Sequence, residues 1–309
     1  MKLMVQIPCY NEEDTISDVI NSIPKKIDKI DEIVILVLND GSTDNSEEII
    51  KKHSVEYIKT KHIGLAEVFK AGLNFAIKNE VDIVVNLDGD NQYKAQDIEK
   101  LIQPILNDNA DIVIGTRPIS KIKTFSFTKK ILQKLGSYIV KIISNTEIED
   151  ATSGFRAYNK KAILKTNIFN KYTYTIENII QAKSKNLVIK NIDIEVNPQP
   201  NRKSKLVKNN FYYIFKQTIN LLRFFVIYSP VKFFGFASAF FFILAGALGF
   251  RYLYYFYHHQ GSGHIQSLIL CSIVFAISFV LANIMILSDI LSVNRKILEE
   301  IQEKIKQIK

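Results

Sequence analysis

The segment VDIVVNLDGDNQY, residues 81–93, carries the pattern that decides the fold of this chain. Residues 81–87 are mostly apolar, which is typical of a strand buried in a parallel sheet that is covered on both faces. Two carboxylates, Asp88 and Asp90, follow with one glycine between them. Side chains two residues apart point to the same side of an extended segment. The pattern therefore places two hard oxygen ligands together, and such ligands favour Mg²⁺ or Mn²⁺.

Two neighbouring residues support a ligand site in this turn. Gln92 lies two residues beyond Asp90 and is expected to add an oxygen ligand or to hold a water. Gly89 lets the backbone pass close to a ligand, because glycine has no Cβ atom. An Asp-Gly pair is also common in ordinary turns. The segment alone therefore leaves a purely structural acidic turn as an alternative.

The residues on both sides of this segment alternate between strand-like and helix-like patterns. Strands are predicted over residues 3–9, 32–39, 55–60, 81–87 and 110–115. Helical periodicity is found over residues 16–23, 66–78 and 98–106. Repeated β-α-β units predict an α/β domain with a mostly parallel, Rossmann-like sheet over residues 1–200. Ligands bind such sheets at the carboxyl ends of the strands, and polar clusters follow four of them, at residues 8–12, 39–44, 88–92 and 115–117.

The C-terminal third contains two long apolar runs. Residues 233–250 and residues 265–288 carry no charged side chain. About 20 apolar residues span a bilayer as a helix. The runs therefore predict a transmembrane hairpin over residues 233–288, with helices at about 233–256 and 265–288. A pair of buried core helices is the alternative interpretation.

A basic juxtamembrane segment, residues 201–232, precedes the first apolar run. It contains seven Lys and Arg residues, no acidic residue and several aromatic ones, within a chain of net charge +9. This composition favours an interfacial helix among lipid headgroups. It is also found in proteins that bind single-stranded nucleic acid, but the adjoining apolar runs favour lipid, and no nucleic-acid partner is predicted. Positive charge before the first span places the N-terminal domain and both termini in the cytoplasm, with residues 289–309 as an amphipathic tail that packs on the domain or on another subunit.

Five motifs occur in a fixed order along the N-terminal part of the chain. They are IPCYNEEDTI (residues 7–16), NDGSTDNS (39–46), NLDGDNQY (86–93), IGTR (114–117) and DATSGFRAY (150–158). Together they resemble the inverting family 2 glycosyltransferases of the GT-A fold. The segment NRKSKL (201–206) and the two apolar runs that follow resemble the polyprenyl-phosphate group of that family, which is similar to dolichol-phosphate mannose synthase. The resemblance implies that DGD fills the place of the family's metal motif, which holds the diphosphate of a nucleotide sugar.

The resemblance also implies a role for individual residues. The implied nucleotide-sugar contacts are Pro8, Tyr10, Glu12, Leu38, Asp40 and Asp88, and the implied metal ligands are Asp88, Asp90 and Gln92. The implied catalytic residues are Asp88, Asp90, Arg117 and Asp150, and the residues that meet the acceptor or diphosphate are Lys130, Arg202, Ser204 and Lys205. The last group departs from the family pattern, because its spacing is shorter and a glycine is missing. Headgroup attraction remains an alternative for Arg202 and Lys205, and a solvated helix face for Lys130.

The predicted reaction is an inverting transfer of a sugar from a nucleotide sugar to a polyprenyl (undecaprenyl or dolichyl) phosphate. The donor stays open between a UDP-sugar and GDP-mannose, with a weak preference for UDP. An acceptor hydroxyl would need a general base, for which Asp150 is the first candidate, whereas a lipid phosphate is already an anion. The alternatives are a family 2 enzyme with a saccharide hydroxyl acceptor and a catalytically inactive membrane scaffold. A homo-oligomer through the hairpin or the tail is possible, and His53 and His62 are assigned surface or packing roles.

Overall fold

The computed structural model describes residues 1–120, 127–169, 174–198, 219, 222, 223, 225–258 and 261–308. The chain divides into two compact units. The first unit consists of residues 1–209 together with residues 301–309, and the second consists of residues 210–300.

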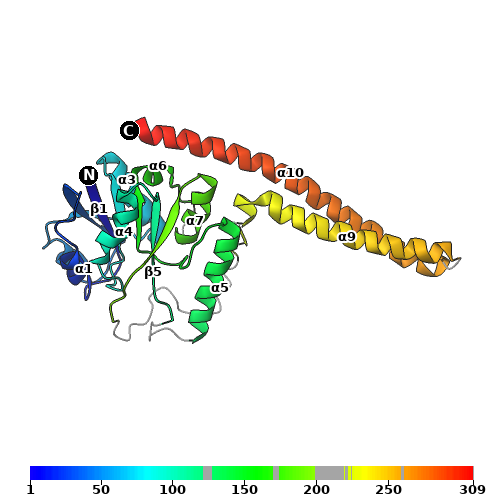
Figure 1. Ribbon diagram of the computed structural model, residues 1–309, viewed down its shortest axis with the longest axis horizontal. Coiled ribbons are helices and arrows are strands. Elements are labelled where there is room, and N and C mark those ends of the chain that lie inside the picture. The colour runs from blue at the N-terminus through cyan, green and yellow to red at the C-terminus, as the bar shows by residue number, and fades with distance from the viewer. Residues whose placement is uncertain are drawn as a thin grey trace. The chain divides into compact units, whose positions relative to one another are not determined.

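A seven-stranded sheet forms the centre of the first unit (Figure 1). Its strands lie in the order β3-β2-β1-β4-β6-β5-β7. They are β1 (Lys2–Cys9), β2 (Glu32–Asn39), β3 (Glu56–Lys59), β4 (Ile83–Asn86), β5 (Ile112–Thr116), β6 (Arg156–Asn159) and β7 (Ile189–Asp193). Every neighbouring pair is parallel except β4–β6 and β5–β6. The predicted mostly parallel sheet is therefore confirmed, and each predicted strand overlaps one of the observed strands β1 to β5.

Three of the helices in the described part of this unit lie where helical periodicity was predicted, at residues 16–23, 66–78 and 98–106. The described helices are α1 (Ile16–Ser22), α2 (Ser46–Ile50), α3 (Leu65–Lys78), α4 (Asp97–Leu106), α5 (Phe127–Ser144), α6 (Lys160–Lys165) and α7 (Thr175–Ser184). In α1 the buried side chains are Ile16, Val19 and Ile20, which lie on one face of the helix. The helix ends before Ile23, whose backbone is extended because the following proline disfavours the helical conformation.

Strand β6 was not predicted, and it changes the layout of the sheet. It is short and polar, with the sequence RAYN. Because it is antiparallel to both neighbours, its first residue, Arg156, pairs with Asn86 at the end of β4 and with Ile114 in β5. The residues that precede β6 therefore lie at the same sheet edge as the carboxyl ends of β4 and β5.

The second unit contains the helical hairpin. Its helices are α9 (Pro230–Tyr257) and α10 (Ile265–Ile308), joined at the short 3₁₀ helix η1 (Gly261–His264). Both are long and apolar enough to cross a membrane, and only 6% and 11% of their most apolar windows are buried. Such exposure contradicts the alternative of buried core helices, because large apolar patches on soluble monomers are rare. The helix α10 continues without a break to residue 308, so the predicted second span and the predicted tail form one helix.

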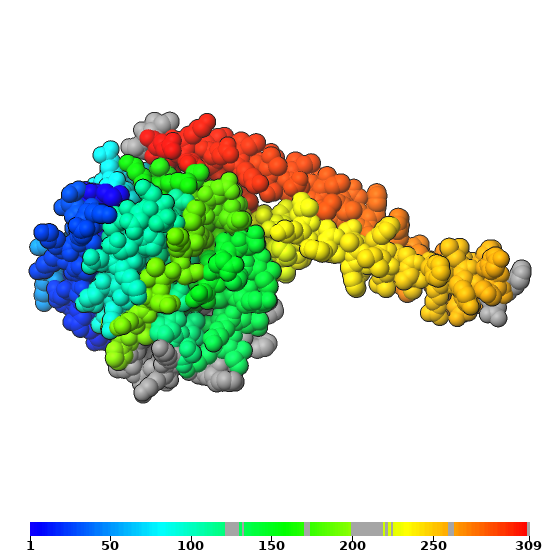
Figure 2. Space-filling view, in the orientation of Figure 1, coloured from blue at the N-terminus to red at the C-terminus, as the bar shows by residue number. Residues whose placement is uncertain are grey.

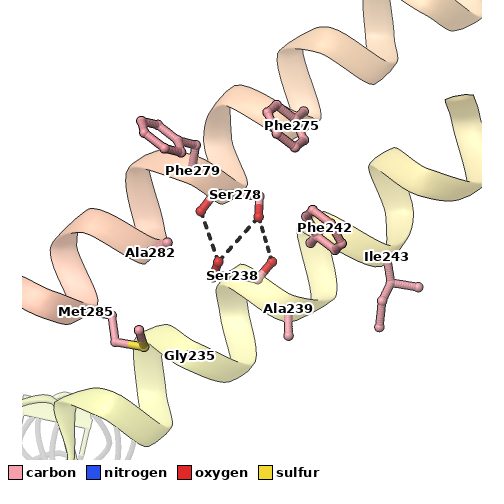
Figure 3. A pocket seen from close by; sticks show the side chains of 10 residues that line it. All are labelled: Gly235, Ser238, Ala239, Phe242, Ile243, Phe275, Ser278, Phe279, Ala282 and Met285. Carbon is pink, nitrogen blue, oxygen red and sulfur yellow. Dashed lines mark hydrogen bonds between the residues drawn. The ribbon is translucent and has the colours of Figure 1, made fainter.

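Small and hydroxylated residues hold α9 against α10, which lie side by side in Figure 2. Ser238 Oγ donates to the Ser278 carbonyl (3.0 Å), and Ser278 Oγ donates to the Ser238 carbonyl (2.9 Å), as Figure 3 shows. Cys271 Sγ donates to the Ala245 carbonyl about two turns further along the helices. The serine pair lies in a groove of about 410 Å³ lined by both helices. In hydrocarbon, close packing and such interhelical hydrogen bonds replace the hydrophobic effect as the force between helices.

The last turns of α10 belong to the first unit. Lys306 Nζ donates to the carbonyls of Leu164 (3.2 Å) and Thr166 (2.9 Å) and to Asn167 Oδ1 (2.9 Å). The first two acceptors lie at the end of α6, where carbonyl groups lack helical partners and attract a cation. The end of the predicted tail, residues 301–309, is therefore part of the first unit.

Candidate active site

The two carboxylates of the D-G-D motif lie in the turn that follows β4. Asn91 has a left-handed backbone (φ 57°), and the Gln92 backbone N–H donates to Asp90 Oδ1 at 3.0 Å. Asp88 Oδ1 accepts one long hydrogen bond, from Asn86 Nδ2 at 3.4 Å. Among the residues that the structure describes, the Asp88 carboxylate accepts no other hydrogen bond. The strand end therefore presents carboxylate oxygens whose acceptor positions are largely unused.

The backbone of Gly154 lies directly against Asp88. A Cβ atom built on Gly154 would be 2.7 Å from Asp88 Oδ2 and 2.9 Å from Oδ1. Real Cβ atoms essentially never approach that closely, so any other residue at position 154 would require the Asp88 carboxylate to move. This contact joins the motifs NLDGDNQY and DATSGFRAY through two residues, Asp88 and Gly154, that are 66 positions apart in sequence.

Burial, and after it the negative charge of Asp90, raise the pKa of Asp88 to about 7 against the opposing effect of the positive charge of Arg117. Such a carboxyl group is partly protonated near neutral pH, and a nearby cation favours its ionised form. The electrostatics of the turn therefore favour a bound divalent cation.

The donor set fits a magnesium or manganese ion held partly by substrate. Among the described residues, no cluster of three or more His, Cys, Asp or Glu side chains is placed to hold a metal. Two carboxylates with open acceptor positions suffice for Mg²⁺ or Mn²⁺, which keep several waters and take substrate phosphates as ligands. The described contacts of Gln92 are made by its backbone, so its part as a ligand stays a prediction.

Two buried side-chain amides, joined by a hydrogen bond, connect β1 to Asp88. Gln6 Nε2 donates to Asn86 Oδ1 (3.0 Å), and Asn86 Nδ2 donates to the Gly154 carbonyl (2.9 Å) as well as to Asp88. Both amides are fully buried. Sequence reasoning missed these two residues, although a polar side chain within the apolar run of each strand, inside β1 for Gln6 and at the end of β4 for Asn86, was a visible signal. A buried amide needs hydrogen-bond partners, so each such residue predicts a network.

Arg117, at the end of β5, forms a bidentate ion pair with Asp150. Its Nε donates to Asp150 Oδ2 (2.7 Å) and its Nη2 donates to Asp150 Oδ1 (3.0 Å). Nη2 also donates to Thr152 Oγ1 (2.7 Å). Burial alone would raise the pKa of Asp150, but the charge and hydrogen bonds of Arg117 outweigh it, so the pKa lies below its ordinary value. The carboxylate stays ionised and both of its oxygens are engaged.

A second buried arginine, Arg156, fixes the loop that carries Gly154. Its guanidinium is fully buried and donates to the carbonyls of Ser153 (2.8 Å), Ala151 (2.9 Å) and Thr175 (2.8 Å). Buried arginine is ordinarily paired with a carboxylate, and here backbone oxygens take that place. The motif contained this arginine, but its role as an anchor of the loop to α7 was visible only in the structure.

The predicted nucleotide edge lies at the carboxyl ends of β1 and β2. Pro8 and Tyr10 lie at and just beyond the end of β1, and Leu38 and Asp40 hold the corresponding positions on β2. The Glu12 backbone N–H donates to Ser46 Oγ at 2.8 Å. Thr15 Oγ1 donates to the Gly89 carbonyl (2.8 Å). The edge is thereby tied to the D-G-D turn.

Of the four residues predicted to meet the acceptor or diphosphate, the structure describes only Lys130. This side chain, in the first turns of α5, donates to the Ser120 carbonyl at 2.8 Å. Arg202, Ser204 and Lys205 lie outside the described residues. Their assignment stays a prediction from the sequence.

Comparisons with known proteins agree with this geometry. The model of the family described as "Glycosyl transferase family 2" matches residues 4–166, which is more than half of the chain. The protein therefore belongs to glycosyltransferase family 2 and is a glycosyltransferase.

Two curated relatives illustrate the family. The UDP-N-acetylglucosamine–dolichyl-phosphate N-acetylglucosaminyltransferase of Methanococcus voltae is 31% identical over 214 residues, which cover 61% of this chain and 83% of the relative. The dolichol-phosphate mannosyltransferase of Pyrococcus furiosus is 31% identical over 173 residues, which cover 53% of this chain and 47% of the relative. The chain thus matches less than half of the second relative.

A solved structure supports the fold. The glucosyl-3-phosphoglycerate synthase of Mycobacterium tuberculosis, in a complex with Mn²⁺ and UDP-glucose, superposes with a TM-score of 0.55. The match covers 72% of this chain and 77% of that chain at 20% identity. At this identity the similarity concerns the GT-A fold, in agreement with the fold expected from the motifs.

Replacing Gly154 by alanine tests the contact with Asp88. The new methyl group would overlap the carboxylate, so Asp88 must move, and we expect Mn²⁺ affinity to fall at least about tenfold, since a displaced ligand loses its charge-assisted contact. Mn²⁺ titration followed by electron paramagnetic resonance measures this. Gly136→Ala is the matched control, because no atom lies within 4 Å of a Cβ at that position. Equal Mn²⁺ affinity in the two variants contradicts the role of Gly154.

The raised pKa of Asp88 predicts a pH dependence of metal binding. Below a pH of about 7 the carboxyl holds a proton in the metal-free protein, and the metal must displace it. Mn²⁺ affinity is therefore expected to fall as the pH is lowered from 8 to 6, by up to about tenfold per unit below the pKa. Isothermal titration in buffers of different ionisation enthalpy also counts the released proton. Affinity that is constant between pH 6 and pH 8 would contradict the prediction.

Proposed function

We propose that this family 2 glycosyltransferase transfers a sugar from a nucleotide sugar to a polyprenyl phosphate, with inversion, at the cytoplasmic face of a membrane. The observation that carries the proposal is the meeting of Asp88, Asp90 and Arg117 at the carboxyl edge of the sheet, in a chain that also has two helices of membrane-spanning length. Relatives of this chain include dolichyl-phosphate and undecaprenyl-phosphate transferases, and they support the acceptor class.

Donor binding is assigned to the edge formed by β1, β2 and β4. Pro8, Tyr10, Glu12, Leu38 and Asp40 hold the nucleoside, and Asp88 and Asp90, with Gln92 nearby, would hold Mg²⁺ or Mn²⁺ beside the diphosphate. A divalent cation bound there supplies positive charge to the leaving group. The raised pKa of Asp88 supports this assignment, because the turn has an excess of negative charge that a cation would neutralise.

The reaction is an in-line displacement at the anomeric carbon. A phosphate oxygen of the acceptor forms the new bond to that carbon, while the bond between the carbon and the donor diphosphate breaks and its electron pair leaves with the nucleoside diphosphate. A lipid phosphate is already an anion, so no general base is needed. Catalysis then rests on positioning and on stabilising the charge of the leaving group.

Asp150 is assigned to holding Arg117 rather than to removing a proton. Both of its oxygens accept hydrogen bonds from Arg117, and Oδ1 also accepts from Thr152. A carboxylate with a lowered pKa is a weak base. This observation favours a phosphate acceptor over a saccharide hydroxyl. Arg202, Ser204, Lys205 and Lys130 are proposed to meet the acceptor phosphate or the diphosphate.

The test is transfer by the purified full-length protein from radiolabelled UDP- and GDP-sugars to undecaprenyl or dolichyl phosphate with Mg²⁺ or Mn²⁺. A lipid-linked monosaccharide phosphate is the expected product with at least one donor. Asp90→Ala is expected to reduce the rate at least about a hundredfold, because it removes a charged ligand. The exposed Asp28 is the matched control carboxylate, and Asp28→Ala should retain the wild-type rate.

The same assay contains the contradicting outcomes. Transfer only to free saccharides, with none to lipid phosphate, would overturn the acceptor assignment. Comparable rates for Asp90→Ala and Asp28→Ala would overturn the part assigned to the D-G-D motif. Circular dichroism of both variants separates loss of catalysis from loss of fold.

A further inference from the structure

Helix α5 (Figure 1) carries a row of large apolar side chains that point away from the first unit. The row has spacings of four, three and four residues, which place its members on one face of the helix. Between 48% and 60% of each residue is exposed, and the four residues of this apolar stripe are Ile131, Leu135, Tyr138 and Ile142. A surface helix ordinarily turns its apolar face to the core. The stripe therefore indicates an apolar partner.

The opposite face of α5 is buried and partly polar. It contains Ser137, Val140 and Ser144. Ser137 Oγ accepts a hydrogen bond from the Ala151 backbone N–H at 3.1 Å. Ala151 belongs to the DATSGFRAY motif, whose Gly154 contacts Asp88. The helix that presents the stripe thus also supports the loop of the candidate active site.

A row of lysines borders the stripe. Lys130, Lys134 and Lys141 lie along one side of it, at spacings of four and seven residues. Lys141 pairs with Glu147, and Lys134 is exposed. Residues 112–146 contain no Asp or Glu. An apolar stripe bordered by cations fits the boundary between the acyl chains and the anionic headgroups of a membrane.

We propose that α5 lies in the plane of a membrane interface, with the apolar stripe at the acyl-chain boundary and the lysine row on anionic phosphate headgroups. The same chain has two helices long and apolar enough to cross a membrane, so a bilayer is available to the stripe. A second copy of the chain could also cover an apolar stripe, but it would add a further row of lysines and no carboxylate on that face. The placement of α5 does not rest on the proposed function. It agrees with that function, because the site loop would be held at the surface where a lipid phosphate lies.

A tryptophan reporter tests the contact, because the chain contains no tryptophan of its own. Tyr138→Trp places the reporter on the stripe of the full-length protein, reconstituted into vesicles of phosphatidylcholine and phosphatidylglycerol. Lipids brominated on their acyl chains should quench its fluorescence, and bromines near the headgroup should quench most, since an interfacial helix lies only about 5–10 Å deep. Val188→Trp is the matched control, because Val188 is similarly exposed (51% against 59%) but lies directly before β7. It should be quenched much less.

The other outcomes of this measurement contradict the proposal. Equal quenching of the two variants would overturn the contact between α5 and lipid. A blue-shifted emission of Tyr138→Trp without quenching would identify a protein surface, such as a second copy, as the partner. Vesicles of phosphatidylcholine alone should quench less, because the lysine row then loses its anionic partner, and equal quenching in both vesicles would overturn the part assigned to the lysines.

A charge placed on the stripe tests the apolar contact directly. Leu135→Glu, added to Tyr138→Trp, should weaken the docking of α5 by about tenfold or more, because it removes a buried apolar side chain. Quenching should then fall toward the level of Val188→Trp. Val188→Glu in the same background is the matched control and should leave quenching unchanged, and circular dichroism checks that each variant is folded. Full quenching in the Leu135→Glu variant would overturn the role of the stripe.

Failure of this inference and failure of the proposed function give different results. Transfer of sugar to a polyprenyl phosphate, with no quenching of Tyr138→Trp, would retain the function and overturn the membrane contact of α5. Strong quenching, with no transfer to any polyprenyl phosphate, would retain the membrane contact and overturn the acceptor.

Discussion

The antiparallel pairing of β6 between β4 and β5 is the constraint on which the geometry of the site depends. Parallel strands end at the edge where an antiparallel neighbour begins. The loop that enters β6 therefore meets the turn that leaves β4, and Gly154 comes into contact with Asp88. With a parallel β6, the loop before it would lie at the opposite edge of the sheet. The same strand places Arg156 beneath the loop, where its hydrogen bonds to backbone carbonyls hold the loop against α7.

The carboxylates of the site differ in how far a neighbouring positive charge neutralises them. This difference is the basis of the chemistry proposed for the site. Arg117 and Asp150 neutralise each other in a buried bidentate pair, so they form a rigid support. Asp88 has no such partner, although Arg117 acts on it through space, and its pKa is raised. Burial of a carboxylate without a neutralising partner destabilises the charged form of that group. A bound cation would offset that cost, in agreement with the proposed metal site at the Asp88 carboxylate.

The hairpin follows a different rule from the domain. In the domain, apolar residues such as Leu3, Val5 and Ile7 are fully buried, whereas most apolar side chains of α9 and α10 are exposed. A bilayer supplies the apolar surroundings that the hairpin lacks within its own unit. The two helices are then held together by close packing at small residues and by the reciprocal hydrogen bonds of Ser238 and Ser278. A membrane anchor of this kind agrees with an enzyme whose proposed acceptor is a lipid.

The local pattern of the chain was sufficient for much of the fold. Apolar runs and 3.6-residue periodicity predicted strands β1 to β5, three helices and two apolar spans, because these features depend on neighbours in sequence. The D-G-D motif and the arginine of IGTR were likewise visible as residues at strand ends. Strand β6 was not, since RAYN has no apolar alternation and is a strand only through pairing on both sides. The amides of Gln6 and Asn86 and the close approach of Gly154 to Asp88 join residues distant in sequence. Each was decided by tertiary structure, because a hydrogen bond or a forbidden Cβ atom depends on where the folded backbone places its partner.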